Sequence, residues 1–178
     1  ATNCHRLGAN EAPPAIISVY LGEQLHDVMD QLISTGSANH SIRGERLATG
    51  VKTLPDFAKD ATDRNRTSPF AFTGNKFEFR MVGSKDSGGE PNTVLNTIVA
   101  EAFCEACDYI EAAEDKDMAI HDLIERYFMK HERIVFDGNG YSDEWVAEAA
   151  KRGLPNLKTM VDAIPALTTE KAVALFEK

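Results

Sequence analysis

The chain has 178 residues, of which 43% are hydrophobic and 26% are charged, so it can form a sizeable core and is not globally disordered. Its formal net charge of -9 argues against a general nucleic-acid binder or a protein that binds anionic membranes, because both need a basic surface. Three cysteines are too few for a disulfide framework, and no apolar run approaches the roughly 20 residues of a membrane helix. These features predict a cytoplasmic protein. Because the chain starts at Ala1 directly in patterned sequence, we expect it to be a piece of a longer polypeptide.

The first predicted element is a helix, followed by a loop and a hairpin. Apolar residues at helical spacing, after two prolines, predict a helix over residues 11–34. Residues 35–69 are polar and interrupted by glycine and proline, which predicts a long loop of the kind that is often functional. The segments Phe70–Thr73 and Lys76–Val82 are joined by Gly74-Asn75, and this pattern predicts two extended strands in a β-hairpin.

The second half of the chain is predicted to be helical. A long helix opens at Pro91, where a missing backbone N–H costs little. The next helix is predicted over about residues 115–131, and after it comes a helix that Ser142 caps and Gly153 stops. Two short helices, from Asn156 and from Thr168-Thr169, complete the chain. The predicted fold class is therefore α+β, helix-rich with a few antiparallel strands.

Positive charge gathers around the second predicted strand of this acidic chain. Alternate residues of a strand share a face, so Lys76, Glu78 and Arg80 are expected to point the same way. Arg64 and Arg66 lie nearby in the sequence. Such a face can hold a divalent ion on Glu78 while the arginines bind phosphate or carboxylate oxygens in a forked geometry. A ladder of salt bridges on a solvated face is the alternative explanation of the same pattern.

A second group of polar residues lies just before the first predicted helix. Arg6 and Glu11 occupy a glycine-containing stretch there. An acidic residue at that point also stabilises the positive end of the helix dipole, which would be the simpler explanation if this motif stood alone.

These two groups belong to long motifs that carry a resemblance. The stretches HRLGANEAPPAI (residues 5–16) and DRNRTSPFAFTGNKFEFR (residues 63–80) closely resemble the catalytic domain of glutamine synthetase, in its large type III form. The later stretch FDGNGYSDEWVAEAAKRGLPNL (residues 136–157) is similar to the segment that type III enzymes carry beyond the shared core. The resemblance implies two parts: residues 1–114, the C-terminal portion of the catalytic domain, and residues 115–178, a helical extension.

The resemblance also implies an activity and the residues that perform it. The activity is ATP-dependent ligation of ammonia to L-glutamate through γ-glutamyl phosphate, with Mg²⁺ or Mn²⁺ as cofactor, in a homo-oligomeric ring. Arg6 matches an arginine that holds the substrate glutamate, and Glu11 matches the flap glutamate that closes the site and takes a proton from ammonium. Glu78 matches a metal ligand, and Arg80 matches a substrate-binding arginine. Lys76 precedes that strand and is expected to reach the nucleotide phosphates.

Arg64 and Arg66 resemble the arginines that stabilise the transferring phosphoryl group, and they complete the implied catalytic set with Glu11. Their spacing to Glu78 is shorter than in the commoner forms of the enzyme, so the division of roles between them stays open. The family's other metal ligands lie upstream of the Arg6 motif. Glu78 alone cannot fill two ion sites, so we expect the isolated chain to be inactive.

Two other functions remain open on the sequence. One is a non-catalytic module that binds an anion or a nucleotide through the arginine face. The other is a subunit-assembly module, formed by the helices after residue 115.

Several further patterns favour a structural role. Cys104 and Cys107 form a C-x-x-C inside a helical pattern without a second pair, which favours half-buried thiols over a zinc or redox site. His121 and Glu125 are expected to form an exposed hydrogen-bonded pair, and His26 has no partner that the sequence identifies. The run from Asp137 resembles a calcium-binding loop only loosely, which favours a turn followed by a helix cap.

Overall fold

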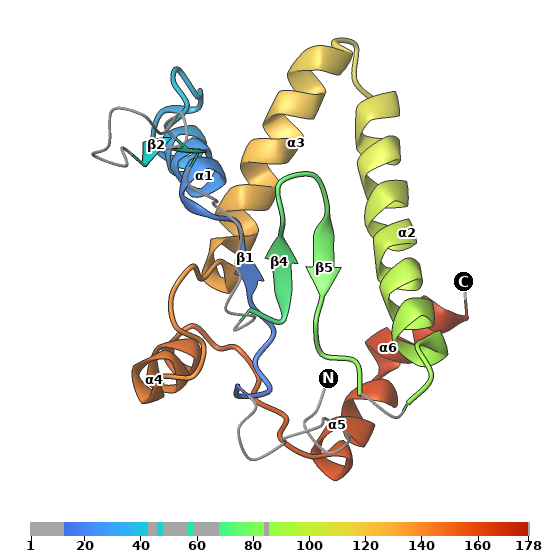
Figure 1. Cartoon of the computed structure of the whole chain (residues 1–178). Coiled ribbons are helices and arrows are strands. Elements are labelled where there is room, and N and C mark those ends of the chain that lie inside the picture. Colours follow the sequence, from blue (N-terminus) through green and yellow to red (C-terminus); the bar gives the residue numbers. More distant parts are fainter. Residues whose placement is uncertain (1–12, 43–45, 48–56, 59–67, 84–85, 178) are drawn as a thin grey trace.

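The structure is a computed structural model of the whole chain, and it describes residues 13–42, 46–47, 57–58, 68–83 and 86–177. In these residues a small mixed sheet is accompanied by a separate strand pair and six α-helices, so the predicted α+β class is confirmed (Figure 1). The strands are β1 (Val19–Tyr20), β2 (Arg46–Leu47), β3 (Phe57–Ala58), β4 (Phe70–Phe72) and β5 (Phe77–Phe79). The helices are α1 (Glu23–Thr35), α2 (Gly89–Glu111), α3 (Lys116–His131), α4 (Asp143–Lys151), α5 (Met160–Leu167) and α6 (Glu170–Phe176), with a 3₁₀ turn η2 (Glu132–Ile134) after α3. Of the helices described, none combines the length and the apolar character that crossing a membrane requires.

The mixed sheet has the order β1-β4-β5, in which β1 is parallel to β4 and β4 is antiparallel to β5. The predicted hairpin is confirmed: the Thr73 N–H donates to the Lys76 carbonyl at 2.8 Å across a turn in which Gly74 has a φ of 93°. The second strand is shorter than predicted. Its pairing continues through one more hydrogen bond, from the Arg80 N–H to the Pro69 carbonyl at 2.8 Å.

The predicted start of the first helix is wrong. The helix α1 begins at Glu23, and the residues before it are extended, since Val19 and Tyr20 pair with β4. Branched and aromatic residues fit a strand well once a partner strand is present, and a pattern within 24 residues cannot reveal that partner. Gly22, with a φ of 79°, turns the chain from the strand into the helix.

The long loop predicted over residues 35–69 contains a strand pair. In this segment β2 pairs with β3 in antiparallel fashion, with Arg46 opposite Ala58 and Leu47 opposite Phe57. Two-residue strands produce no alternation that a sequence pattern can detect, which explains why the pair was not predicted.

The two long helices, α2 and α3, contact each other, run in opposite directions and diverge away from the turn that joins them (Figure 1). The helix predicted over about residues 115–131 is confirmed, and Asp115 caps it, because its side chain accepts a hydrogen bond from the Met118 N–H at 3.0 Å. The Lys116 ammonium donates to the carbonyls of Ile110 and Glu111 at 2.9 and 3.0 Å. A cation therefore satisfies the negative end of α2, as the helix dipole favours.

The later helices also begin at local caps. Ser142 accepts from the Trp145 N–H at 3.1 Å, which confirms the predicted cap of α4, and Gly153 ends this helix region with a φ of 69°. The helix predicted from Asn156 begins instead at Met160, after a capping box formed by Thr159 and Asp162.

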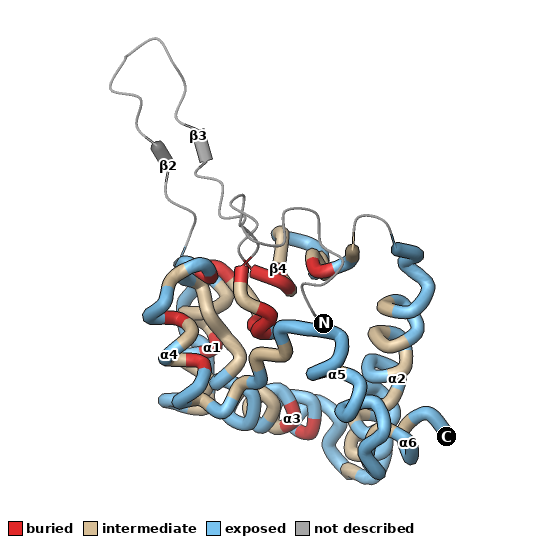
Figure 2. Tube along the Cα trace, turned by 90° about the horizontal axis from the view of Figure 1, so that it is seen from below, coloured by how far each residue is buried: buried red, intermediate tan, exposed pale blue. Residues whose placement is uncertain are grey.

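Buried residues lie mainly around the sheet, α1, α3 and α4, as Figure 2 shows, whereas α2 has no buried residue. One cluster joins the two ends of the chain: Ile16 packs with Trp145 and Ala149, and the half-buried Phe136, Val146 and Leu154 surround them. Among the described residues, large apolar side chains remain exposed on four helices: Ile98, Val99 and Phe103 of α2, Met118, Ile120, Ile124 and Met129 of α3, Met160, Val161, Ile164 and Leu167 of α5, and Val173 and Phe176 of α6.

Candidate functional site

Three polar side chains meet on one face of the β4–β5 hairpin. One carboxylate oxygen of Glu78 lies 3.2 Å from the Lys76 ammonium. The other oxygen accepts hydrogen bonds from Nη2 and Nε of Arg80 at 3.2 and 3.3 Å. The prediction that these residues share a face is therefore confirmed, whereas their chemical roles stay predictions.

The charges on this face are unequally exposed. The side chain of Arg80 is 16% exposed, that of Glu78 is 38% exposed and that of Lys76 is 65% exposed. Hydrogen bonds from Lys76 and then from Arg80 hold the pKa of the Glu78 carboxyl below its ordinary value, against the opposing effect of desolvation. Glu78 is thus an ionised acceptor at neutral pH, and it holds the guanidinium of Arg80 in place.

Aromatic rings fix the opposite face of the same hairpin. Phe70 stacks on Phe77 with ring centroids 5.5 Å apart. The ring of Phe72 lies 5.3 Å from that of Phe77, and the ring of Phe79 lies 6.1 Å from that of Phe70. On the polar side, Glu78 lies opposite Ala71, which is completely buried. Aromatic packing of this kind stabilises the strand pair and so keeps the polar face in one register.

Four of the predicted site residues lie outside the described residues: Arg6, Glu11, Arg64 and Arg66. The strands that follow them in the chain are described. Strand β1 follows Glu11, strand β4 follows Arg66, and Val19 of β1 lies opposite Phe70 of β4 in parallel pairing. Because parallel strands start at the same edge of a sheet, β1 and β4 share their starting edge. The antiparallel strand β5 ends at that edge, where Arg80 bonds to Pro69.

A divalent ion needs more oxygen ligands than this face supplies. An ionised carboxylate such as Glu78 is the ligand type that Mg²⁺ and Mn²⁺ prefer, but one carboxylate occupies at most two of about six positions. Glu78 therefore fits such an ion as one ligand of a larger site, and the remaining ligands have to come from other residues.

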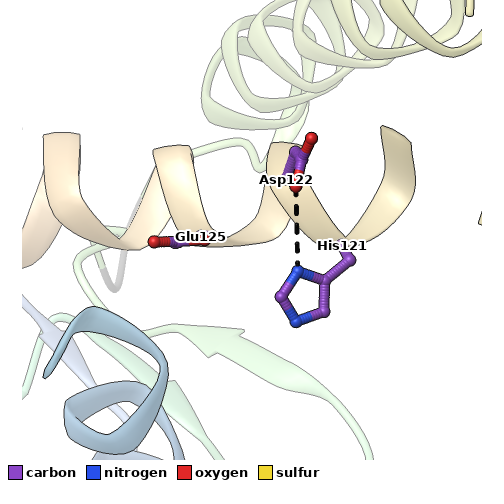
Figure 3. A group of neighbouring side chains, drawn as sticks. All are labelled: His121, Asp122 and Glu125. Carbon is purple, nitrogen blue, oxygen red and sulfur yellow. Dashed lines mark ion pairs between the residues drawn. The ribbon is translucent and has the colours of Figure 1, made fainter. Parts of the chain in front are cut away.

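One group of three possible metal ligands is present among the described residues, on α3 (Figure 3). The ligand atoms of His121, Asp122 and Glu125 lie within 4.8 Å of one another. The expected pair of His121 with Glu125 is replaced by a contact of His121 Nδ1 with Asp122 at 3.9 Å. His121 is exposed and the group lies on a single helix, so these residues have the features of an ordinary solvated surface cluster rather than of a metal site.

Sequence reasoning missed the partner of His26. Its Nδ1 lies 2.5 Å from a carboxylate oxygen of Asp137, 111 residues away in the chain. The turn expected after Asp137 is confirmed, since the Asn139 side chain accepts from the Tyr141 N–H at 3.0 Å before Ser142 caps α4. Cys104 and Cys107 are free thiols, and both are exposed rather than half-buried.

Comparison with known proteins supports the resemblance. The family model "Glutamine synthetase C-terminal domain" matches residues 119–178. The chain is 45% identical over 99% of its length to the type-3 glutamine synthetase of Dictyostelium discoideum, covering 24% of that protein. It is 41% identical over 100% of its length to a glutamine synthetase of Butyrivibrio fibrisolvens, covering 25% of it. The predicted resemblance is thereby confirmed over the whole chain, which spans about a quarter of the length of these relatives.

Proposed function

We propose that this chain, which is similar over its whole length to type III glutamine synthetases, supplies one edge of a glutamine synthetase active site. The observation that carries the proposal is the meeting of Lys76, Glu78 and Arg80 on one face of the β4–β5 hairpin. Strands β1 and β4 start at the same edge of this sheet, and β5 ends at that edge, next to Arg80. The proposed reaction is the ATP-dependent ligation of ammonia to L-glutamate.

The polar face of the hairpin has the chemistry that this reaction needs. L-Glutamate carries two carboxylates, and the guanidinium of Arg80, oriented by Glu78, is a suitable donor to one of them. Lys76 pairs with Glu78 but is largely exposed on a flexible stem, so its ammonium can also approach a phosphate of ATP. We assign Glu78 as one ligand of Mg²⁺ or Mn²⁺, which when bound neutralises negative charge on the phosphates.

The remaining assignments follow the resemblance. Arg6 holds the glutamate substrate. Glu11 closes the site and accepts a proton from ammonium, because ammonium becomes a nucleophile only after losing one. Arg64 and Arg66 stabilise the negative charge that spreads over the phosphoryl oxygens during transfer to the γ-carboxylate.

The proposed enzyme is a cytoplasmic homo-oligomer in which residues 1–114 belong to the catalytic domain and residues 115–178 form a helical extension. Exposed apolar side chains on α2, α5 and α6 support an assembly role, because monomers rarely leave so many uncovered. Phe103 is 66% exposed and Val161 is 77% exposed. Light scattering of the full-length protein measures the oligomer directly.

The decisive experiment changes Glu78 in the full-length protein that contains this chain. The Glu78→Gln variant keeps the shape of the side chain but lacks the charge that orients Arg80. We expect glutamine formation to fall at least about 100-fold, with the far-ultraviolet circular dichroism unchanged. The control is Glu114→Gln, a change at an exposed glutamate between α2 and α3, which should leave the activity as it was. Activity of Glu78→Gln close to the wild-type value would refute the assignment.

A non-catalytic binding module is the second candidate function. It is favoured by the exposure of Lys76 on a face where two cations share one carboxylate, that of Glu78. Isothermal titration of the 178-residue chain with L-glutamate, and separately with Mg-ATP, tests it. Heat of binding that Arg80→Ala abolishes supports this candidate, whereas no detectable binding counts against it.

A further inference from the structure

The side chain of Asp137 links the C-terminal part of the chain to the end of strand β1. One carboxylate oxygen accepts hydrogen bonds from the N–H groups of Leu21 and Gly22 at 2.9 and 3.2 Å. The other oxygen lies 2.5 Å from Nδ1 of His26, in the first turns of α1. A single carboxylate therefore holds the point where the strand turns into the helix.

The backbone next to Asp137 also pairs with β1. Val135 and Val19 form a parallel β-bridge, and the Phe136 N–H donates to the Val19 carbonyl at 3.0 Å. Residues 135–137 thus lie along the free side of β1, on the opposite side from β4. They extend the sheet by one short segment.

This short segment is itself firmly held. The ring of Phe136 stacks on that of Trp145 with centroids 3.7 Å apart and planes at 8°, and Trp145 is only 3% exposed. The Arg152 guanidinium donates to the Val135 carbonyl at 3.0 Å. A Cβ at Gly138 would lie 2.6 Å from the Phe136 ring, so a larger residue there has to displace the ring.

The contacts of Asp137, just after the end of β1, are connected to Glu78 through two strand pairings. Leu21 follows Tyr20, which lies opposite Ala71 in β4, and Ala71 lies opposite Glu78 in β5. We infer that Asp137 is a positioning residue, which sets the register of β1 and thereby the geometry of the site edge formed by Glu78 and Arg80. This inference rests on the proposed function, and it gives the segment similar to the type III-specific part a role in the site itself.

The test compares two substitutions of Asp137 in the full-length protein. The Asp137→Ala variant loses every acceptor, whereas Asp137→Asn keeps one oxygen for the backbone N–H groups and turns an amide toward His26. We expect kcat/KM for L-glutamate to fall at least about tenfold in Asp137→Ala, because small misplacements of positioning groups are costly. Asp137→Asn should restore it to within about threefold of wild type. The matched control, Asp143→Ala, removes an exposed carboxylate from the same segment and should leave kcat/KM unchanged.

Kinetics are compared at a temperature where circular dichroism shows every variant folded, so that a purely stabilising contact leaves kcat/KM unchanged. If Asp137→Ala does not fold, Gly138→Ala takes its place, since it displaces the Phe136 ring while Asp137 remains. Wild-type kcat/KM in the folded variant overturns the inference and leaves the proposed function intact. No glutamine formation by the wild-type protein overturns the proposed function, and the positioning role with it.

Hydrogen exchange in the 178-residue chain distinguishes a failure of the positioning role from a failure of the proposed function. In Asp137→Ala, we expect the protection of the Leu21 and Gly22 amides to drop at least about tenfold. Such a drop supports the hydrogen bonds that Asp137 accepts at the end of β1 independently of any measured activity. Unchanged protection of these amides overturns the positioning role.

Discussion

Trp145 is the side chain on which the shared core depends most. The residue is 3% exposed, and its ring stacks on Phe136. It also packs against Ile16, which lies near the N-terminal end of the chain. The guanidinium of Arg152 lies 5.6 Å from its ring. Trp145→Ala removes the stacking partner, the apolar contact with Ile16 and the ring beneath the cation in a single change.

The expected loss is large relative to the stability of such a chain. Replacing a buried tryptophan by alanine costs about 3–5 kcal/mol, of which the aromatic pair accounts for roughly 0.5–1.5 kcal/mol. Domains are stable by about 5–15 kcal/mol, so this change removes a fifth or more of the total. For a chain of this size it corresponds to a fall in Tm of about 6–20 °C.

The assay is urea unfolding followed by circular dichroism, because Trp145 is the one tryptophan in the sequence and the variant lacks its fluorescence. Trp145→Phe keeps a ring for Phe136 to stack on and should lose less than half as much stability. The matched surface control is Phe103→Ala on α2, where a ring 66% exposed should contribute within about 0.5 kcal/mol. A loss for Trp145→Ala no larger than that for Phe103→Ala would refute the placement of the core.

Two further predictions concern charge and backbone. Because hydrogen bonds from Lys76 and Arg80 lower the pKa of Glu78, their stabilising effect is present above its ordinary value of 4.5 and is lost as the pH falls through the lowered value. The difference in unfolding free energy between wild type and Glu78→Gln should therefore be measurable at pH 7 and vanish in acid; a difference independent of pH would contradict the pairing. Gly153 has a φ of 69°, so Gly153→Ala should cost about 1–2 kcal/mol in urea unfolding, and an unchanged midpoint would show that the strain is relieved.

Features set by neighbouring residues were predictable from the sequence. The cap at Ser142 and the start of α3 next to Asp115 lie where the pattern placed them, since a cap needs only a side-chain oxygen and the N–H groups two or three residues later. The hairpin at Gly74 and the common face of Glu78 and Arg80 follow from turn chemistry and strand alternation in the same way.

Features set by distant residues were not predictable. Ile17 and Leu21 fit a helical stripe, yet this segment is extended because β4, about fifty residues later in the chain, offers a partner strand. The contact between His26 and Asp137 spans 111 residues, and no periodicity or motif connects them. The site residues themselves were identified by the resemblance, because one carboxylate between two cations also describes an ordinary surface ladder.

The packing bears on how the two proposed parts of the chain act. A purely external assembly module would keep its own core and touch the catalytic part only at its surface. Here Ile16 is buried against Trp145, Val19 pairs with Val135, and the Leu21 N–H is satisfied by Asp137. Without residues 115–178, the apolar side chain of Ile16 would lose these partners and β1 would lose the segment that flanks it. The packing therefore connects residues 115–178 to the hairpin of Glu78 and Arg80 through β1, and this connection is the basis on which we propose that they influence the site.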